Sequence, residues 1–151
     1  MKDDPIPNEH HVTRLCKTSG LNDDQTRPIT AAFMPKEGEE YLSVNWVEFF
    51  CLSSREDGID QIRQCLNTKF ELRPSYRLGL LNVGELIARV KADTRRTVIP
   101  EVVHRPDEPK PDPSHSGIFN LPHQDKEKML TVANALVESV LDVVPAKRLA
   151  M

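Results

Sequence analysis

The sequence predicts an α+β fold: a single domain with a small mixed sheet, about three to four helices and a long amphipathic helix near the C-terminus. Short alternating or β-branched segments interleave with segments of helical periodicity, which predicts strands and helices in one unit. The length of 151 residues, with 38% hydrophobic and 28% charged residues, is typical of one folded domain. We expect that domain over residues 11–145, with flexible segments at 1–10 and 146–151.

The first half of the chain predicts two strands and a short helix. Residues 11–17 alternate in polarity and predict a strand, and a turn-rich connector follows at 18–27. Residues 41–44 predict a second strand. Asn45 is a residue type that caps helices, and we expect it to begin a short helix over 46–52.

The middle of the chain predicts two helices. One begins after Ser53 or Ser54, where acidic residues in the first turn suit the helix dipole. Asn82 is the expected cap of the second, over 83–93, because its apolar residues form one stripe. Strands are expected just before and just after this second helix, at 76–81 and at 97–103.

The C-terminal part predicts one more strand, at 117–119, and the long helix. The helix is expected over 124–143, ended by Pro145, because apolar residues recur at helical spacing. The residues of this stripe are Leu130, Ala133, Leu136, Val137, Val140, Leu141 and Val144.

Charge and cysteine usage predict a cytoplasmic protein that binds neither nucleic acid nor membrane. The net charge of −3 and the pI of about 6.0 give no electrostatic reason to bind an anionic polymer or bilayer. The one basic cluster in the sequence, Arg95–Arg96, is expected to be a solvated helix end. No apolar run is long enough to span a bilayer or resembles a signal peptide. The three cysteines are odd in number and widely spaced, as expected of free thiols in a reducing compartment.

The segment 104–123 is the richest in chemistry, because prolines stiffen a loop that carries three histidines. If this loop folds back, His104, Asp112 and His115 become candidate metal ligands, but their spacing matches no closed zinc motif, and no metal is predicted. Ser114 and His115 are adjacent, which usually points two side chains apart, so a serine hydrolase dyad is not favoured. The glycines stand alone without a phosphate loop, so no cofactor is predicted.

Two other features have a functional and a structural interpretation. The segment 41–50 holds half of the aromatic residues, and Trp46 is expected to anchor the core rather than a binding surface. Cys16 lies between Arg14 and Lys17, and nearby cations activate a thiol, but the sequence places no histidine beside it.

Three segments resemble a loose group of small, uncharacterised bacterial proteins: Arg27-Pro-Ile-Thr-Ala-Ala-Phe33, Leu42-Ser-Val-Asn-Trp46 and Asp112-Pro-Ser-His-Ser-Gly-Ile118. The resemblance implies a bacterial origin and one compact domain, and it implies no activity. It also implies that these segments meet in space. In that case Arg27, Ser43, Asn45 and His115 would line one pocket.

The favoured hypothesis is a small binding or interaction module that engages a protein partner or a second copy of itself. Its recognition residues would be Arg27, Ser43, Asn45, Trp46, Ser114 and His115. The alternative is a small hydrolase or group-transfer enzyme in which His115 is the general acid or base and Arg27 binds an anionic substrate group. An enzyme predicts that these groups converge in a concave pocket, and a binding module predicts a flat surface.

Overall fold

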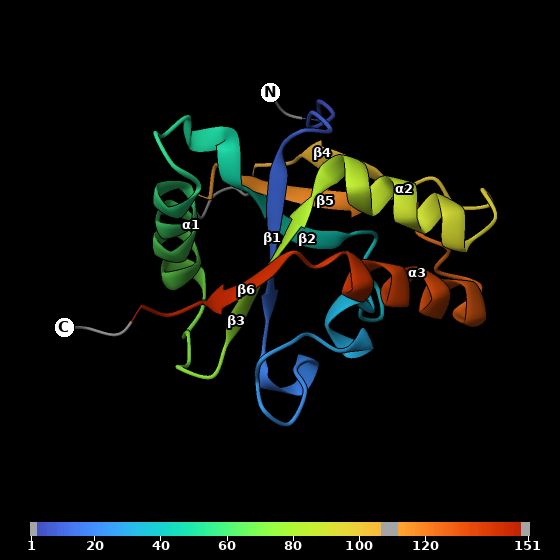
Figure 1. Ribbon diagram of the computed structural model, residues 1–151, viewed down its shortest axis with the longest axis horizontal. Coiled ribbons are helices and arrows are strands. Elements are labelled where there is room, and N and C mark those ends of the chain that lie inside the picture. Colours follow the sequence, from blue (N-terminus) through green and yellow to red (C-terminus); the bar gives the residue numbers. More distant parts are fainter. Residues whose placement is uncertain (1–2, 107–111, 149–151) are drawn as a thin grey trace.

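The computed structural model describes residues 3–106 and 112–148, which form one six-stranded sheet and three α-helices (Figure 1). This confirms the α+β class. The strands are β1 (His11–Cys16), β2 (Leu42–Trp46), β3 (Arg77–Asn82), β4 (Glu101–His104), β5 (His115–Phe119) and β6 (Asp142–Pro145). The helices are α1 (Arg55–Lys69), α2 (Val83–Asp93) and α3 (Lys126–Ser139), with 3-10 turns η1 (Thr18–Gly20), η2 (Thr30–Phe33) and η3 (Val47–Phe50).

The sheet is antiparallel throughout, so the prediction of a mixed sheet is wrong. Its strand order is β4-β5-β2-β1-β3-β6, and every neighbouring pair is antiparallel. A parallel pair needs a crossover that returns the chain beside the strand it has just left. Here α1, α2 and α3 each lead from one strand to another that is not its neighbour, and the described residues form no parallel pair.

Helix capping follows the sequence at two of the three expected positions. The side chain of Ser54 accepts a hydrogen bond from Asp57 N at 3.1 Å, and Asn82 accepts one from Glu85 N at 2.9 Å. Asn45 is not a cap. It is the fourth residue of β2, and its amide group donates to other side chains. In place of the helix predicted over 46–52, the structure has the short 3-10 turn η3.

The C-terminal helix is shorter than predicted. α3 ends at Ser139, and residues 142–145 form the edge strand β6 beside β3, because a segment with the β-branched pair Val143 and Val144 suits a strand. The predicted stripe is buried only in part: Ala133, Leu136 and Val140 are buried, whereas Leu130 and Leu141 are 47% and 51% exposed. The buried residues of α3 are Met129, Val132, Ala133, Ala135 and Leu136.

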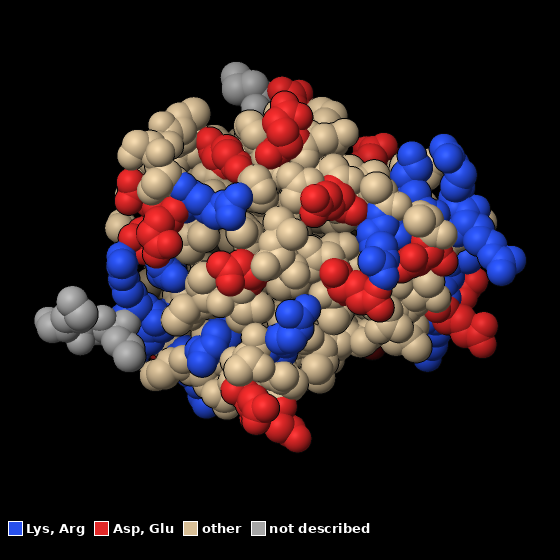
Figure 2. Space-filling model, in the orientation of Figure 1, with Lys and Arg blue, Asp and Glu red and all other residues tan. Residues whose placement is uncertain are grey.

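The helices cover both faces of the sheet (Figure 1). α2 and α3 pack side by side over a core that includes Val12, Val44 and Ile118, and α1 packs on the opposite face against Leu78 and Leu80. Acidic and basic side chains are interspersed over the face in Figure 2, with Lys and Arg gathered beyond the end of α2. The predicted basic cluster of Arg95 and Arg96 follows α2, which ends at Asp93, and both residues are exposed.

Both termini contact the sheet over the described residues. Ile6 is 3% exposed, and its N–H donates to Val102 O on β4 at 2.9 Å. Ala146 is buried and donates to Tyr76 O at 3.0 Å. Parts of the segments expected to be flexible are therefore packed in this structure. Among residues 3–106 and 112–148, no helix combines the length and the apolar character that crossing a bilayer requires.

Candidate functional site

The sheet splits between β1 and β2. These strands pair only at Val12 with Trp46 and at Thr13 with Asn45, although each continues for three more residues. Beyond the last pair β1 turns away and runs steeply across the direction of β4 and β5 (Figure 1). The opening holds a cavity of about 390 Å³. We call it the fork pocket, and its polar and aromatic lining residues are Arg14, Lys17, Ser19, Lys36, Glu39, Ser43, Asn45, Lys69, Phe70 and His115.

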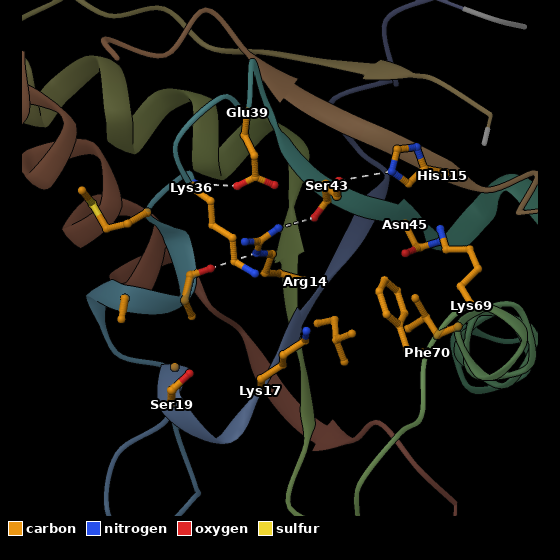
Figure 3. A pocket seen from close by; sticks show the side chains of 16 residues that line it. Arg14, Lys17, Ser19, Lys36, Glu39, Ser43, Asn45, Lys69, Phe70 and His115 are labelled. Atoms are coloured by element: carbon orange, nitrogen blue, oxygen red, sulfur yellow. Dashed lines mark hydrogen bonds between the residues drawn. The ribbon is translucent and has the colours of Figure 1, made fainter. Parts of the chain in front are cut away.

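Arg14 closes the gap between the separated strands. Its Nε donates to Ala32 O at 2.9 Å and its Nη1 donates to Ser43 O at 2.8 Å, so the guanidinium bonds to β2 where a backbone N–H of β1 would otherwise lie (Figure 3). Burial lowers the pKa of Arg14, and the negative charge of Glu39 opposes that shift. A guanidinium has more N–H groups than these two carbonyls use. Arg14 is therefore a fixed cation that can still donate to a ligand.

Three lysines join Arg14 around the pocket, and each comes from a different segment (Figure 3). Lys17 follows β1, Lys36 follows η2 and Lys69 ends α1. Lys17 Nζ and Lys69 Nζ lie 5.6 and 5.8 Å from the centre of the Phe70 ring, which is itself 41% exposed. Among the residues that the structure describes, Glu39 is the one carboxylate that lines the pocket. Asp112 compensates the charge of Lys69, so the excess of positive charge in the pocket comes from Arg14, Lys17 and Lys36 against Glu39, although the chain as a whole carries −3.

A buried polar network holds one wall of the pocket. Lys69 Nζ donates to Asp112 Oδ2 at 2.8 Å, and the Asn45 amide donates to both oxygens of Asp112 at 2.9 and 3.0 Å and to Ser114 Oγ at 2.9 Å. Asp112 is fully buried. Burial alone would raise the pKa of Asp112, but the hydrogen bonds from Lys69, Asn45 and Ser114, with the charge of Lys69, lower it below its ordinary value. Asp112 is therefore an ionised anchor for Lys69.

His115 is held in one tautomer at the pocket wall. Its Nδ1 is 2.7 Å from Arg105 O, and a carbonyl only accepts, so Nδ1 carries the proton. Its Nε2 is 3.2 Å from Ser43 Oγ. In the neutral ring Nε2 is an acceptor, and the Ser43 hydroxyl is therefore the donor.

The structure brings together some of the predicted site residues and separates others. Ser43, Asn45 and His115 line the fork pocket. Ser114 is buried behind them and supports Asp112. Arg27 is exposed in the turn after Asn22 and does not line the pocket, so Arg14 occupies the position expected for Arg27.

Trp46 and His104 belong to a separate cluster. Trp46 Nε1 donates to His10 Nδ1 at 3.0 Å, and His104 packs against the rings of Trp46 and Phe49 at 5.3 and 5.1 Å. His104 Nε2 donates to Pro113 O at 2.6 Å. The candidate ligands His104, Asp112 and His115 thus bond to different partners, and the part of the chain that the structure describes holds no cluster of three or more metal-ligating groups.

Cys16 is not an activated thiol. It is 1% exposed, and burial raises its pKa to about 11 despite the charge of Arg14. Cys51 is the exposed cysteine of this chain, and Cys65 is half-buried.

Sequence reasoning missed Arg14 and the three lysines because they are far apart along the chain. One signal was present at Arg14: it lies between Val12 and Cys16 in an alternating strand, so the strand period places a charge on the face that these two bury. Comparisons with known proteins found no matching family model, no matching curated protein and no matching solved structure.

Proposed function

We propose that this protein is a binding module that accepts an anionic group, a carboxylate or a phosphate, in the fork pocket. The observation that carries this proposal is the convergence of Arg14, Lys17 and Lys36 on one cavity where, among the described residues, Glu39 is the single lining carboxylate. Lys69 also lines the cavity, with its charge paired to Asp112. Clefts lined by one sign of charge focus the field and attract ligands of the opposite sign. A cavity of about 390 Å³ lies within the size range of small-ligand sites.

The lining residues offer a ligand both positive charge and apolar surface. Arg14 is held by two backbone carbonyls, so its N–H groups meet a ligand in a fixed orientation. Lys17 and Lys36 supply mobile charge, and the exposed ring of Phe70 supplies apolar area. This set favours a ligand in which a carboxylate or phosphate is attached to an apolar or planar group.

The anionic group has two possible sources, a free small molecule or an acidic segment of a protein partner. The concave shape of the pocket supports the first, and the expectation of an interaction module supports the second. We place the protein in the cytoplasm, because its cysteines are odd in number and described as free thiols.

Isothermal titration calorimetry with two probes tests the proposal. Citrate represents a free small anion, and an acidic hexapeptide of alternating Glu and Phe represents a protein segment. We expect saturable binding of at least one probe, weakened about tenfold or more in the double variant Lys17→Met with Lys36→Met, because each lost charge removes about 1 kcal/mol. Arg27→Met is the matched control: it removes an exposed cation outside the pocket, and affinity should not change.

The probes separate the sources of the anion. Binding of citrate alone favours a free ligand, and binding of the peptide alone favours an acidic protein segment. No saturable binding of either probe, or equal weakening by Arg27→Met and by the lysine variant, contradicts the proposal.

A further inference from the structure

Ser43 and His115 form a hydrogen-bonded pair inside the fork pocket. They lie on the neighbouring strands β2 and β5 and share one face of the sheet, because Asn45 pairs with His115 and Ser43 is two residues before Asn45. Both side chains line the pocket (Figure 3). Ser43 is half-buried and His115 is 7% exposed.

The pair has the arrangement that activates a hydroxyl nucleophile. Such a site needs a base within hydrogen-bond reach of the hydroxyl and a third group that orients the base. His115 Nε2 is 3.2 Å from Ser43 Oγ, and Arg105 O fixes the ring through Nδ1 at 2.7 Å. A backbone carbonyl here takes the orienting position that a carboxylate holds in a Ser-His-Asp triad. The serine is Ser43 from a distant strand, whereas the neighbour of His115 in sequence, Ser114, is bonded to Asp112.

We propose that Ser43 is a nucleophile toward esters that carry an anionic group, with His115 as its general base. This inference rests on the proposed function, because the cations of the fork pocket are what would hold the charged end of such a substrate. It assigns the reaction class, acyl transfer to Ser43 followed by hydrolysis.

The steps balance with water as the only co-reactant. Ser43 Oγ attacks the ester carbonyl carbon while its proton moves to His115 Nε2. The bond to the leaving oxygen breaks, and that oxygen takes the proton from His115 Nε2, which leaves an acyl group on Ser43. A water molecule then gives a proton to Nε2 and attacks the acyl carbon, and the proton returns to Ser43 Oγ as the acid leaves.

Arg14 places positive charge beside the reacting residue. Its Nη1 donates to the backbone carbonyl of Ser43 itself, so the guanidinium is held against the strand that carries the proposed nucleophile. A cation held there favours negative charge that develops on a substrate bound at Ser43. The fixed orientation matters because a preorganised donor needs no rearrangement during the reaction.

Labelling with a fluorophosphonate probe tests the nucleophile. Attack by Ser43 Oγ forms an O–P bond and releases fluoride, and the adduct is located by peptide mass spectrometry. We expect one adduct, on Ser43, that is absent in the Ser43→Ala variant. In the His115→Gln variant the adduct should form more slowly by a factor of about 100 or greater. Ser19 lines the same pocket with no histidine in hydrogen-bond distance among the described residues, and it should stay unlabelled. Circular dichroism and thermal unfolding confirm that each variant is folded.

Ester hydrolysis gives a second measurement that does not depend on the His115 variant. We expect the wild type to hydrolyse a nitrophenyl hemiester of a dicarboxylic acid with a higher kcat/KM than nitrophenyl acetate, and Ser43→Ala to lose both activities. Labelling of Ser19 as fast as Ser43, or no labelling of Ser43, overturns the inference. If citrate or the acidic peptide binds while Ser43 stays unreactive, the inference fails and the proposed binding function stands; if neither binds, both fail.

Discussion

Lys69 and Asp112 form a buried ion pair that joins the end of α1 to the segment before β5. Lys69 Nζ lies 2.8 Å from Asp112 Oδ2, and the two side chains are 8% and 0% exposed. Two buried opposite charges stabilise a fold only when their remaining hydrogen-bonding groups are also satisfied. Asn45 and Ser114 meet that condition for Asp112. The pair thereby sets the position of a lysine that lines the fork pocket.

Replacing Asp112 with Asn should lower the free energy of unfolding by about 3 kcal/mol, because the charge of Lys69 stays buried without its counter-charge. Urea denaturation followed by circular dichroism measures this loss. Asp93→Asn is the control: Asp93 pairs with Arg89, and these side chains are 34% and 44% exposed, so we expect a loss of about 0.5 kcal/mol. Equal losses of unfolding free energy in the two variants would show that the buried Lys69–Asp112 pair stabilises the fold no more than an exposed pair does.

The contribution of Asp112 should also depend on pH in the acid range. Its folded pKa is lowered, so the stabilisation is complete above the unfolded pKa of about 3.9 and disappears as the pH falls through the lower folded value. The difference in unfolding free energy between wild type and Asp112→Asn should be constant above about pH 5 and shrink below about pH 4. A difference that grows as the pH falls would contradict the sign of this shift.

Gly117 should tolerate no side chain. A Cβ at this position would lie 2.5 Å from Tyr41 Cδ2 and 2.6 Å from Phe119 Cε1, where the two rings stack with centres 4.5 Å apart. Gly117→Ala should therefore lower stability by about 1–3 kcal/mol, as overpacking does. In the control Gly79→Ala, the nearest atom to the new Cβ is Pro28 Cγ at 3.5 Å, and stability should be unchanged or rise by about 0.5 kcal/mol. Chemical denaturation of both variants gives their unfolding free energies, which can be compared directly.

Arg14→Lys should keep the positive charge in the fork pocket but weaken the hydrogen bonding that links β1 to β2 and η2. An ammonium cannot reproduce the fixed geometry in which Nε and Nη1 bond to Ala32 O and Ser43 O. We expect a loss of about 2 kcal/mol in unfolding free energy, since hydrogen bonds from charged groups contribute about 1.5–3 kcal/mol each. Unchanged stability by urea denaturation would mean that other contacts hold the two strands at the fork.

The cysteines should react in the order of their exposure. At pH 8 about one thousandth of Cys16 is thiolate, given its pKa of about 11, and the side chain is buried. Iodoacetamide should therefore modify Cys51 first and reach Cys16 only after unfolding in urea. Peptide mass spectrometry over a time course gives the order, and modification of native Cys16 at the rate of Cys51 would rule out its burial.

The sequence by itself determined the elements whose signals are local. Ser54 and Asn82 were predicted as caps, and both accept the expected backbone hydrogen bond, because a cap depends on residues only three positions apart. The strand at 11–16 followed from alternation for the same reason. Asn45 carried the same cap signal and is a strand residue, because its amide bonds to Asp112, 67 residues away.

Only the tertiary structure decided the sheet and the site. Val143 and Val144 carry apolar side chains that were counted toward a helix, and pairing with the edge of β3 selects the strand. Likewise, no local pattern brings Arg14, Lys36 and Lys69 together, since they meet only where β1 separates from β2. The resemblance placed Arg27 in such a pocket, yet Arg27 is exposed and does not line the fork pocket. A charged residue on the buried face of a strand, such as Arg14, can be recognised from the sequence as a candidate site residue. Which other charged residues lie beside it in the fork pocket is determined by the fold.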